Sequence, residues 1–361
     1  MKVGVNARTF AVTEPGGAVQ TAMRLTRELS ERDLQLELFG PSCLSETFPA
    51  VPVISTGYPR GSQAFGLLWE RTALPVLARR QGIDVLFCPN GNGPLHRTAC
   101  PVVLQIHDLN TFHGYSNRVH RLYRRAAVPR AAANAAAIVT VSSFSKREIV
   151  STLGVDPEGV HVTSNGVHEE FLEPADGATL DCPAPYVLYV GALSRRKNVD
   201  RLIAAFRHLK STTGIPHELV LVGPEKPTIT QTRSPDGVEN IHTPGYLERS
   251  RLRAAYRNAD AFVYPSLYEG FGLPPLEAMA CDTPVVASDA TALPEVLGDG
   301  AEFVDPMAVD SIADGLHRVL TDSGYRQTLV RRGRRRAATF TWDRVADRLL
   351  AVLREVVESA G

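Results

Sequence analysis

Two carboxylates, Glu269 and Glu277, lie close together in a segment rich in glycine and proline, EGFGLPPLE. The apolar run AFVY (261–264) precedes this segment and PVVAS (284–288) follows it, and both runs are typical of buried strands. Two prolines stand where a helix can begin, because the first helical residues need no amide donor. The pattern predicts a strand, a loop, a short helix and a second strand, with one glutamate before the helix and one inside it.

The loop between the glutamates is suited to bind an anion. Gly270 and Gly272 allow the backbone to approach a ligand closely. The amides of Phe271, Gly272 and Leu273 lie at the positive end of the helix, which suits a phosphate or pyrophosphate. The glutamates can accept hydrogen bonds from hydroxyl groups, so a sugar and a ribose would fit on opposite sides of the phosphates. The alternative is an ordinary β-α-β unit with two solvated glutamates.

A basic turn follows the first strand of the second half of the chain. The string RRKN places Arg195, Arg196 and Lys197 directly before a helix that begins near Asn198. Cations in this position can bind a pyrophosphate and stabilise a departing nucleotide. We favour Arg196 and Lys197 for this role and expect Arg195 on the surface. The alternative is a solvated basic turn.

These strings resemble the retaining glycosyltransferases of family 4, which have the GT-B fold. EGFGLPPLEAMA resembles the family's Glu-x7-Glu motif, and RKN resembles a basic pair found in a branch with many mannosyltransferases. The resemblance implies that Glu269 contacts donor-sugar hydroxyls and Glu277 the nucleotide ribose. It also implies that Arg196 and Lys197 stabilise the departing diphosphate. Asp282 replaces the family's usual glycine after the helix, and we expect it to adopt the left-handed conformation that Asp tolerates.

The resemblance implies three further groups of ligand contacts. They fall on Gly16 and Gly17, on His107, and on Gly245, Tyr246 and Leu247. The paired glycines would cover the nucleotide phosphates, and the third group would bind the nucleobase. His107 would contact the donor sugar and complete the catalytic set. Each group also has a simpler interpretation, since a glycine pair can be only a turn and a histidine can satisfy a local contact.

Composition limits the classes of function. The chain has 361 residues, enough for two domains, and its 39 basic and 39 acidic residues give a formal net charge of zero. This balance argues against a nucleic-acid partner, which would require a basic excess. The five cysteines are widely spaced, without metal-ligand spacing, so we expect reduced thiols and a cytoplasmic protein. We find no segment long enough to span a membrane.

Short apolar strands alternate with helical patterns in both halves, which predicts an α/β fold with a doubly wound parallel sheet in each half. A segment at 171–185, rich in Pro, Asp, Ala and Gly, separates the halves. We expect a Rossmann-like acceptor domain over 1–170, a linker over 171–185 and a Rossmann-like donor domain over 186–341. By resemblance to GT-B proteins, the last helix, about 342–361, rejoins the first domain. We expect ligands in a cleft between the domains.

Three other motifs have mainly structural interpretations. Ser142 is expected to cap a helix, and the string NGV at 165–167 resembles a family turn that closes the first domain. Two basic clusters, at 121–125 and 331–336, could contact an anionic membrane or a lipid-phosphate acceptor. Solvated helix faces are the commoner interpretation of such clusters.

The sequence therefore predicts a retaining glycosyltransferase that moves a hexose from a nucleotide sugar to a hydroxyl of a glycan, a lipid-linked sugar or a small molecule. No Asp-x-Asp motif is present, so we expect neither a metal nor another cofactor, and we favour GDP-mannose over a UDP-sugar as donor. The expected location is the cytoplasm, with peripheral contact at the inner face of the membrane as an option. An epimerase or hydrolase of the same fold, and a non-catalytic nucleotide-binding scaffold, remain alternatives.

Overall fold

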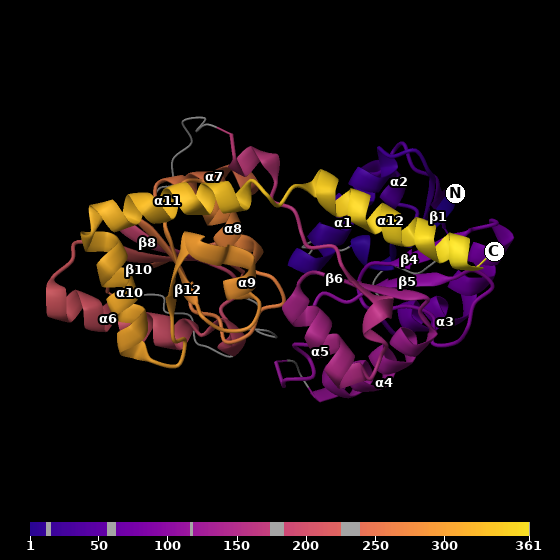
Figure 1. Cartoon of the computed structure of the whole chain (residues 1–361), viewed down its shortest axis with the longest axis horizontal. Coiled ribbons are helices and arrows are strands. Elements are labelled where there is room, and N and C mark those ends of the chain that lie inside the picture. Colours follow the sequence, from indigo (N-terminus) through magenta and orange to yellow (C-terminus); the bar gives the residue numbers. More distant parts are fainter. Residues whose placement is uncertain (12–15, 56–62, 116–117, 174–183, 225–238, 361) are drawn as a thin grey trace. The chain divides into compact units, whose positions relative to one another are not determined.

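The computed structural model describes residues 1–11, 16–55, 63–115, 118–173, 184–224 and 239–360 (Figure 1). The chain forms two compact units, and each contains one sheet. The first unit combines Met1–Gly166 with Trp342–Gly361, and the second consists of Val167–Thr341. The first unit is therefore built from both ends of the chain.

The sheet of the first unit has seven strands in the order β3-β2-β1-β4-β5-β6-β7, and neighbouring strands are parallel. Its strands are Lys2–Asn6 (β1), Gln35–Phe39 (β2), Val53–Ile54 (β3), Val85–Cys88 (β4), Val102–Gln105 (β5), Ala137–Thr140 (β6) and Val160–Val162 (β7). The central strands are continuous apolar runs because helices cover both faces of a parallel sheet of this kind.

Two separate clusters of buried side chains show how the helices cover this sheet. One cluster contains residues of α1 and α12, and the other contains residues of α3, α4 and α5. The helices of the unit are Arg8–Phe10 (η1), Gly17–Ser30 (α1), Leu44–Thr47 (α2), Gln63–Arg80 (α3), Arg118–Asn134 (α4), Ser143–Leu153 (α5), Pro157–Gly159 (η2) and Trp342–Ala360 (α12). Ser142 caps α5 as expected, since its hydroxyl accepts a hydrogen bond from the Ser145 amide at 3.0 Å.

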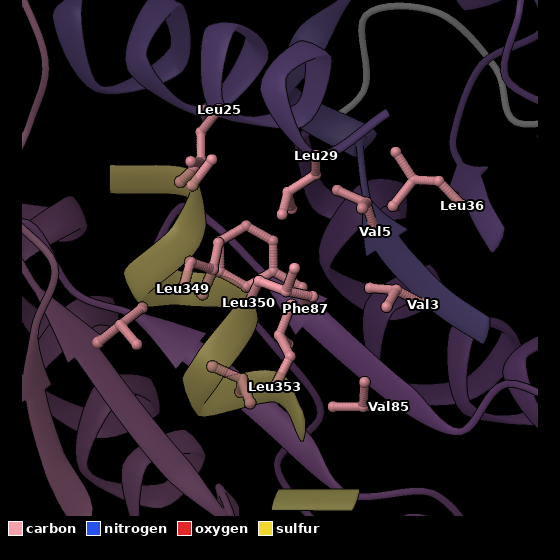
Figure 2. Packing of buried hydrophobic residues seen from close by; sticks show 14 of the residues in the cluster. Val3, Val5, Leu25, Leu29, Leu36, Val85, Phe87, Leu349, Leu350 and Leu353 are labelled. Carbon is pink, nitrogen blue, oxygen red and sulfur yellow. The ribbon is translucent and has the colours of Figure 1, made fainter. Parts of the chain in front are cut away.

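Helix α12 holds the end of the chain against the first unit. Figure 2 shows its leucines gathered with those of α1 and with apolar residues of β1 and β4. Ion pairs fasten its first turns, because Arg32 contacts Asp343 at 2.9 Å and Asp347 at 3.0 Å. Gly166 lies where the unit ends, and a Cβ atom there would come within 2.7 Å of Trp342, the first residue of α12.

The sheet of the second unit has six parallel strands in the order β10-β9-β8-β11-β12-β13. The strands are Tyr186–Val190 (β8), Glu218–Val222 (β9), Ile241–Gly245 (β10), Ala261–Tyr264 (β11), Val285–Ser288 (β12) and Ala301–Val304 (β13). The helices are Glu169–Phe171 (η3), Arg195–Lys197 (η4), Val199–Thr213 (α6), Arg249–Arg257 (α7), Leu273–Ala280 (α8), Leu293–Leu297 (α9), Gly298–Gly300 (η5), Val309–Thr321 (α10) and Ser323–Ala337 (α11).

The prediction of two doubly wound parallel sheets is confirmed. Three strands escaped sequence analysis, because β3 and β7 have only two and three residues and Glu302 interrupts the apolar run of β13. Residues directly after Gly166 pack on the second unit, where Arg253 and Arg257 donate hydrogen bonds to the carbonyls of Glu170 and Phe171 at 2.9 and 3.1 Å. The expected linker at 171–185 lies mostly outside the described residues.

The cysteines and the helices bear on the expected reduced thiols and on the expected lack of a membrane span. Cys43, Cys88, Cys100 and Cys281 have free thiols, and Cys182 lies outside the described residues. Among the helices that the structure describes, none has the length and apolar character needed to cross a membrane.

Candidate active site

The two motifs of the second unit meet at the carboxyl edge of its sheet. Strands β8 and β11 are neighbours at the centre, where the strand order changes direction. The turn after β8 carries η4, and the loop after β11 leads into α8. A backbone hydrogen bond of 2.8 Å joins them, from the Leu267 amide to the Arg196 carbonyl. Such a switch point is where ligands bind in open α/β sheets.

Glu269 forms two ion pairs with the basic turn. Its Oε1 lies 2.6 Å from Lys197 Nζ, and its Oε2 lies 3.0 Å from Arg196 Nη1. Lys197 and Glu269 are both buried, with exposed fractions of 8% and 7%. The structure thus brings together three site residues that the sequence places far apart. Arg195 is exposed, as expected.

The ion pairs govern the ionisation of Glu269. Burial by itself would raise the pKa of this carboxyl group, but the charges of Arg196 and Lys197 outweigh burial and lower the pKa to about 2. The group is therefore a carboxylate at neutral pH. With two cations and one anion, the cluster carries one net positive charge.

Two buried tyrosines support Lys197, and sequence analysis missed both. Lys197 Nζ donates a hydrogen bond to the hydroxyl of Tyr264 and lies 4.5 Å from the centre of its ring. Tyr189 stacks on Tyr264 with ring centres 6.1 Å apart. Burial raises the pKa of both phenols well above the usual value, so they stay neutral. Their position in the sequence could have identified them, because each tyrosine lies at or near the end of a central strand, where ligands bind in such sheets.

The basic turn has a fixed backbone. Asn198 has the left-handed conformation, with φ of 62°, which Asn tolerates better than most residues. Its side-chain amide donates to the carbonyls of Pro265 and Pro306 at 3.0 and 2.6 Å. Arg196 donates to the Tyr268 carbonyl at 2.8 Å. These contacts hold the turn against the loop that carries Glu269.

The start of α8 carries the glycine loop in which we expect an anion site. Gly272 has a φ of 107°, and a Cβ atom there would lie 2.5 Å from a methyl group of Leu293, so only glycine fits. Phe271 is buried edge-to-face on Phe340, with ring centres 5.5 Å apart. Pro274 and Pro275 have no N–H, so the amides at the positive end of the helix dipole are those of Leu273 and of Phe271 and Gly272 before it. Beyond the helix, Asp282 has a φ of 62°, which confirms its predicted left-handed conformation.

Glu277 lies one turn into α8 in a different environment. It is half-buried, and its Oε2 accepts a hydrogen bond of 2.9 Å from the hydroxyl of Tyr256, a buried residue of α7. Burial raises the pKa of Glu277 to about 7, although Tyr256 and Arg249 act in the opposite direction. Sequence analysis did not identify Tyr256, because it comes from another helix.

The group expected to bind the nucleobase follows β10. Gly245 ends this strand with a φ of 75°, Tyr246 is 68% exposed and Leu247 is 4% exposed. Only Tyr246 presents its side chain to solvent. The segment after LVGP, at 225–238, lies outside the described residues.

The remaining expected site residues belong to the first unit. His107 follows β5, and its Nε2 lies 3.1 Å from the Pro89 carbonyl, so Nε2 carries the proton. Burial lowers the pKa of His107, which favours a neutral ring with Nδ1 as an acceptor. Gly16 and Gly17 begin α1, and a Cβ atom on either would meet no atom within 4 Å.

A buried polar network lies near the ends of β1 and β4 in the same unit, and sequence analysis missed it. Glu70 of α3 is 2% exposed, accepts a hydrogen bond of 2.8 Å from Asn6 and pairs with Arg8 at 2.9 Å. Arg124 of α4 donates to the Gly91 carbonyl and to Asn92 Oδ1, each at 3.0 Å. Arg124 thereby holds the loop after β4, whose Pro89 carbonyl contacts His107.

Each half of the chain matches the profile of a known glycosyltransferase family. Residues 179–336 match the profile of the glycosyl transferases group 1, and residues 15–171 match that of Glycosyltransferase Family 4. The O-antigen chain mannosyltransferase B of Escherichia coli is 32% identical over 254 residues, which cover 67% of each chain. The MMP alpha-(1->4)-mannosyltransferase of Mycolicibacterium hassiacum is 35% identical over 225 residues, or 61% of this chain and 54% of that protein.

Solved structures show the same fold over nearly the whole chain. The sucrose-phosphate synthase of Thermosynechococcus elongatus superposes with a TM-score of 0.79 at 21% identity and covers 99% of both chains. Anabaena HepE in complex with UDP and glucose has a TM-score of 0.73 at 18% identity, covering 98% of this chain and 100% of that chain.

Proposed function

The chain belongs to the family 4 glycosyltransferases, and we propose that it is a retaining hexosyltransferase that uses a nucleotide-sugar donor. The observation that carries this proposal is the buried cluster of Glu269, Arg196 and Lys197 beside the start of α8. Its net positive charge and the helix dipole both favour a diphosphate. The acceptor would be a hydroxyl of a glycan, a lipid-linked sugar or a small molecule.

GDP-mannose is the donor that we favour, with a UDP-sugar as the alternative. The two relatives named above are mannosyltransferases, and Anabaena HepE, a structural neighbour, was solved with UDP and glucose. In our proposal the ribose hydroxyls donate to Glu277 and the sugar hydroxyls to Glu269. Gly245, Tyr246 and Leu247 contact the base, and Gly16, Gly17 and His107 contribute from the first unit.

Catalysis in this proposal depends on stabilising the leaving group. Negative charge grows on the diphosphate as its bond to the sugar breaks, and Arg196, Lys197 and the α8 amides interact more strongly with it in the transition state. Arg196 and Lys197 hold Glu269 as a carboxylate with a pKa of about 2, and in this proposal the carboxylate orients the sugar by accepting hydrogen bonds from its hydroxyl groups. The acceptor attacks from the side of the departing phosphate, whose oxygen takes the acceptor proton. This path preserves the anomeric configuration.

The same cations replace a divalent metal ion in the proposal. Fixed positive groups in a buried site stabilise phosphate charge without a metal, because they are already oriented and poorly hydrated. Donor binding and sugar transfer should therefore persist in excess EDTA.

A donor screen tests the proposal. The full chain is melted with GDP-mannose, GDP-glucose, UDP-glucose and the free nucleotides, with and without EDTA, because a bound ligand raises Tm by mass action. We expect GDP-mannose to give the largest increase, unchanged by EDTA. Calorimetric titration then gives Kd, and release of GDP with candidate acceptors reports transfer. Failure of every nucleotide to raise Tm would overturn the donor assignment, and a strict requirement for Mg²⁺ or Mn²⁺ would overturn the metal-independent mechanism.

A further inference from the structure

Helices α3 and α4 cover the same face of the first sheet. Trp69, Leu74 and Ala78 of α3 share one core cluster with Val128 and Ala131 of α4. The helices also touch at their sides, where the Arg71 guanidinium lies 5.8 Å from the centre of the Tyr123 ring. Because their inner sides pack into one cluster, their outer sides face away from the sheet in the same direction. Figure 1 shows both helices on the first unit, at the magenta to purple part of the chain.

The outer sides of these helices expose large apolar residues. Leu68 and Val76 of α3 are 56% and 50% exposed, and Val119 and Leu122 of α4 are 81% and 74% exposed. Among the described residues, seven large apolar side chains are exposed, and these are four of them. Val119 and Leu122 are three residues apart, so they lie side by side on one stripe of the helix. Exposed apolar groups gathered on the outer sides of two helices that touch are typical of an interaction surface.

The charges around the apolar residues have a single sign. Helix α4, RVHRLYRRAAVPRAAAN, contains five arginines and no acidic residue. Arg118, Arg125 and Arg130 are exposed, whereas Arg124 turns inward to Gly91 and Asn92. Helix α3 ends with exposed Arg79 and Arg80. Its acidic residue, Glu70, is buried and paired with Arg8. The outer face therefore combines apolar and cationic groups.

The second basic cluster of the sequence, at 331–336 on α11, differs from α3 and α4 in two ways: its arginines have partners within the unit, and exposed apolar residues do not accompany them. Arg332 pairs with Asp299 at 3.3 Å, and Arg334 pairs with Asp282. Arg336 donates to the carbonyls of Glu295 and Val296 at 2.7 and 2.8 Å. These arginines fasten α11 to its own unit. Helix α11 has no large apolar side chain that is exposed.

We propose that the outer face of α3 and α4, formed by Leu68, Val76, Val119, Leu122 and the neighbouring arginines, docks on an anionic lipid membrane. Arginines attract the anionic headgroups, and the apolar side chains enter the boundary between headgroups and acyl chains. Two properties favour this partner over a second copy of the chain. A two-fold dimer through this face would place arginines opposite arginines, and the face offers no acidic groups to pair with them. The proposal does not depend on the chemistry of the donor site.

Vesicle flotation tests the docking surface with the full chain. We expect binding to vesicles of phosphatidylcholine mixed with phosphatidylglycerol, little binding to phosphatidylcholine alone, and release by salt, since surface attraction is screened. The variant Val119→Ser/Leu122→Ser removes the most exposed apolar pair, and Arg118→Glu/Arg121→Glu reverses two charges. Each should lower the partition coefficient at least about tenfold, because several weak contacts add on one surface.

Matched controls change the same residue types elsewhere. Met307→Ser removes an apolar side chain that is 60% exposed on the second unit, and Arg331→Glu/Arg335→Glu changes the cluster on α11. Both should bind vesicles like the wild type, and all variants should keep the wild-type Tm and nucleotide Kd. The proposal is overturned if the wild type ignores anionic vesicles, or if the serine pair binds as well as the wild type. A dimer in solution that the serine pair dissociates would also overturn it and assign the face to a second copy.

Discussion

Glu269 and Glu277 come from one loop and one short helix, yet the second unit gives them opposite electrostatic environments. Glu269 is buried between Arg196 and Lys197, which lower its pKa to about 2. Glu277 has a tyrosine hydroxyl as its close partner, and burial raises its pKa to about 7. A cationic partner offsets the cost of burying a carboxylate, and a neutral hydroxyl offsets only part of it.

The difference separates two roles that the motif alone treats alike. A carboxylate that stays ionised across the physiological range can orient hydroxyl groups at a reacting centre whatever the pH. A carboxylate that titrates near neutrality binds its ligand with a strength that depends on pH. The following predictions test this contrast, from the largest expected effect to the smallest.

The largest effect is expected from Glu269→Ala. The change leaves Lys197 buried and both cations without their carboxylate, and removing one partner of a buried ion pair costs about 3–5 kcal/mol. Chemical denaturation of the full chain, followed by probes in the second unit, measures the loss. Glu295→Ala, at an exposed glutamate of α9, should lose much less. A loss near that of this control would mean that the ion pairs contribute little to the fold.

Arg196→Ala tests whether the cations act in the transition state. We expect turnover to fall about 10²–10³-fold, with a smaller rise in the donor KM. Arg195→Ala is the matched control, because it removes the exposed arginine next in the chain. Steady-state kinetics of both variants with the donor from the thermal screen provide the comparison. Equal turnover in the two variants would remove Arg196 from the leaving-group role.

Glu277→Ala should weaken nucleotide binding without a comparable loss of stability. A hydrogen bond to a charged group contributes about 1.5–3 kcal/mol, so Kd for GDP should rise roughly 10- to 100-fold, measured by titration calorimetry above pH 7. Glu277→Gln keeps the shape and should lie between the alanine variant and the wild type. An unchanged Kd in the alanine variant would reject the contact with ribose.

The most gradual effect is expected in the pH dependence of stability, where one titrating group changes the free energy of unfolding by at most about 1.4 kcal/mol per pH unit. The raised pKa of Glu277 means that the folded chain holds a proton there between pH 4.5 and about 7 that the unfolded chain has released. Its contribution is therefore complete below pH 4.5 and lost as the pH rises through about 7. The contribution of Glu269 runs the other way, being present above pH 4.5 and lost as the pH falls through about 2.

Denaturation midpoints of Glu277→Gln across this range measure the effect. The glutamine cannot release a proton, so the variant should gain stability relative to the wild type as the pH rises toward 7. Tyr256→Phe should raise the pKa of Glu277 further, because the tyrosine hydroxyl favours the carboxylate, and should move the same transition to higher pH. Parallel pH profiles for the wild type and the glutamine variant would contradict the raised pKa.

Much of the second unit was predictable because its motifs are local. Strand–loop–helix signals placed β11, α8 and β12 within a residue or two, and the left-handed Asp282 followed from its place after a helix. Two features require glycine at 272, namely its φ of 107° and the methyl group of Leu293 that a Cβ atom would meet. A loop sequence can suggest the positive φ, but it cannot reveal the contact with Leu293. Strand β3 has only two residues, too few to be recognised, and Glu302 interrupts the apolar run of β13.

By itself, the sequence determined the fold class, the family and the identity of the main candidate residues, because hydrophobic periodicity and loop chemistry are encoded over short stretches. Tertiary structure alone decided which groups surround each candidate. Arg196 and Lys197 reach Glu269 only because β8 and β11 are neighbours, and Tyr256 reaches Glu277 only because α7 packs beside α8. Charge and burial act over a few ångströms in space, and the packing that sets those distances joins residues that are remote along the chain.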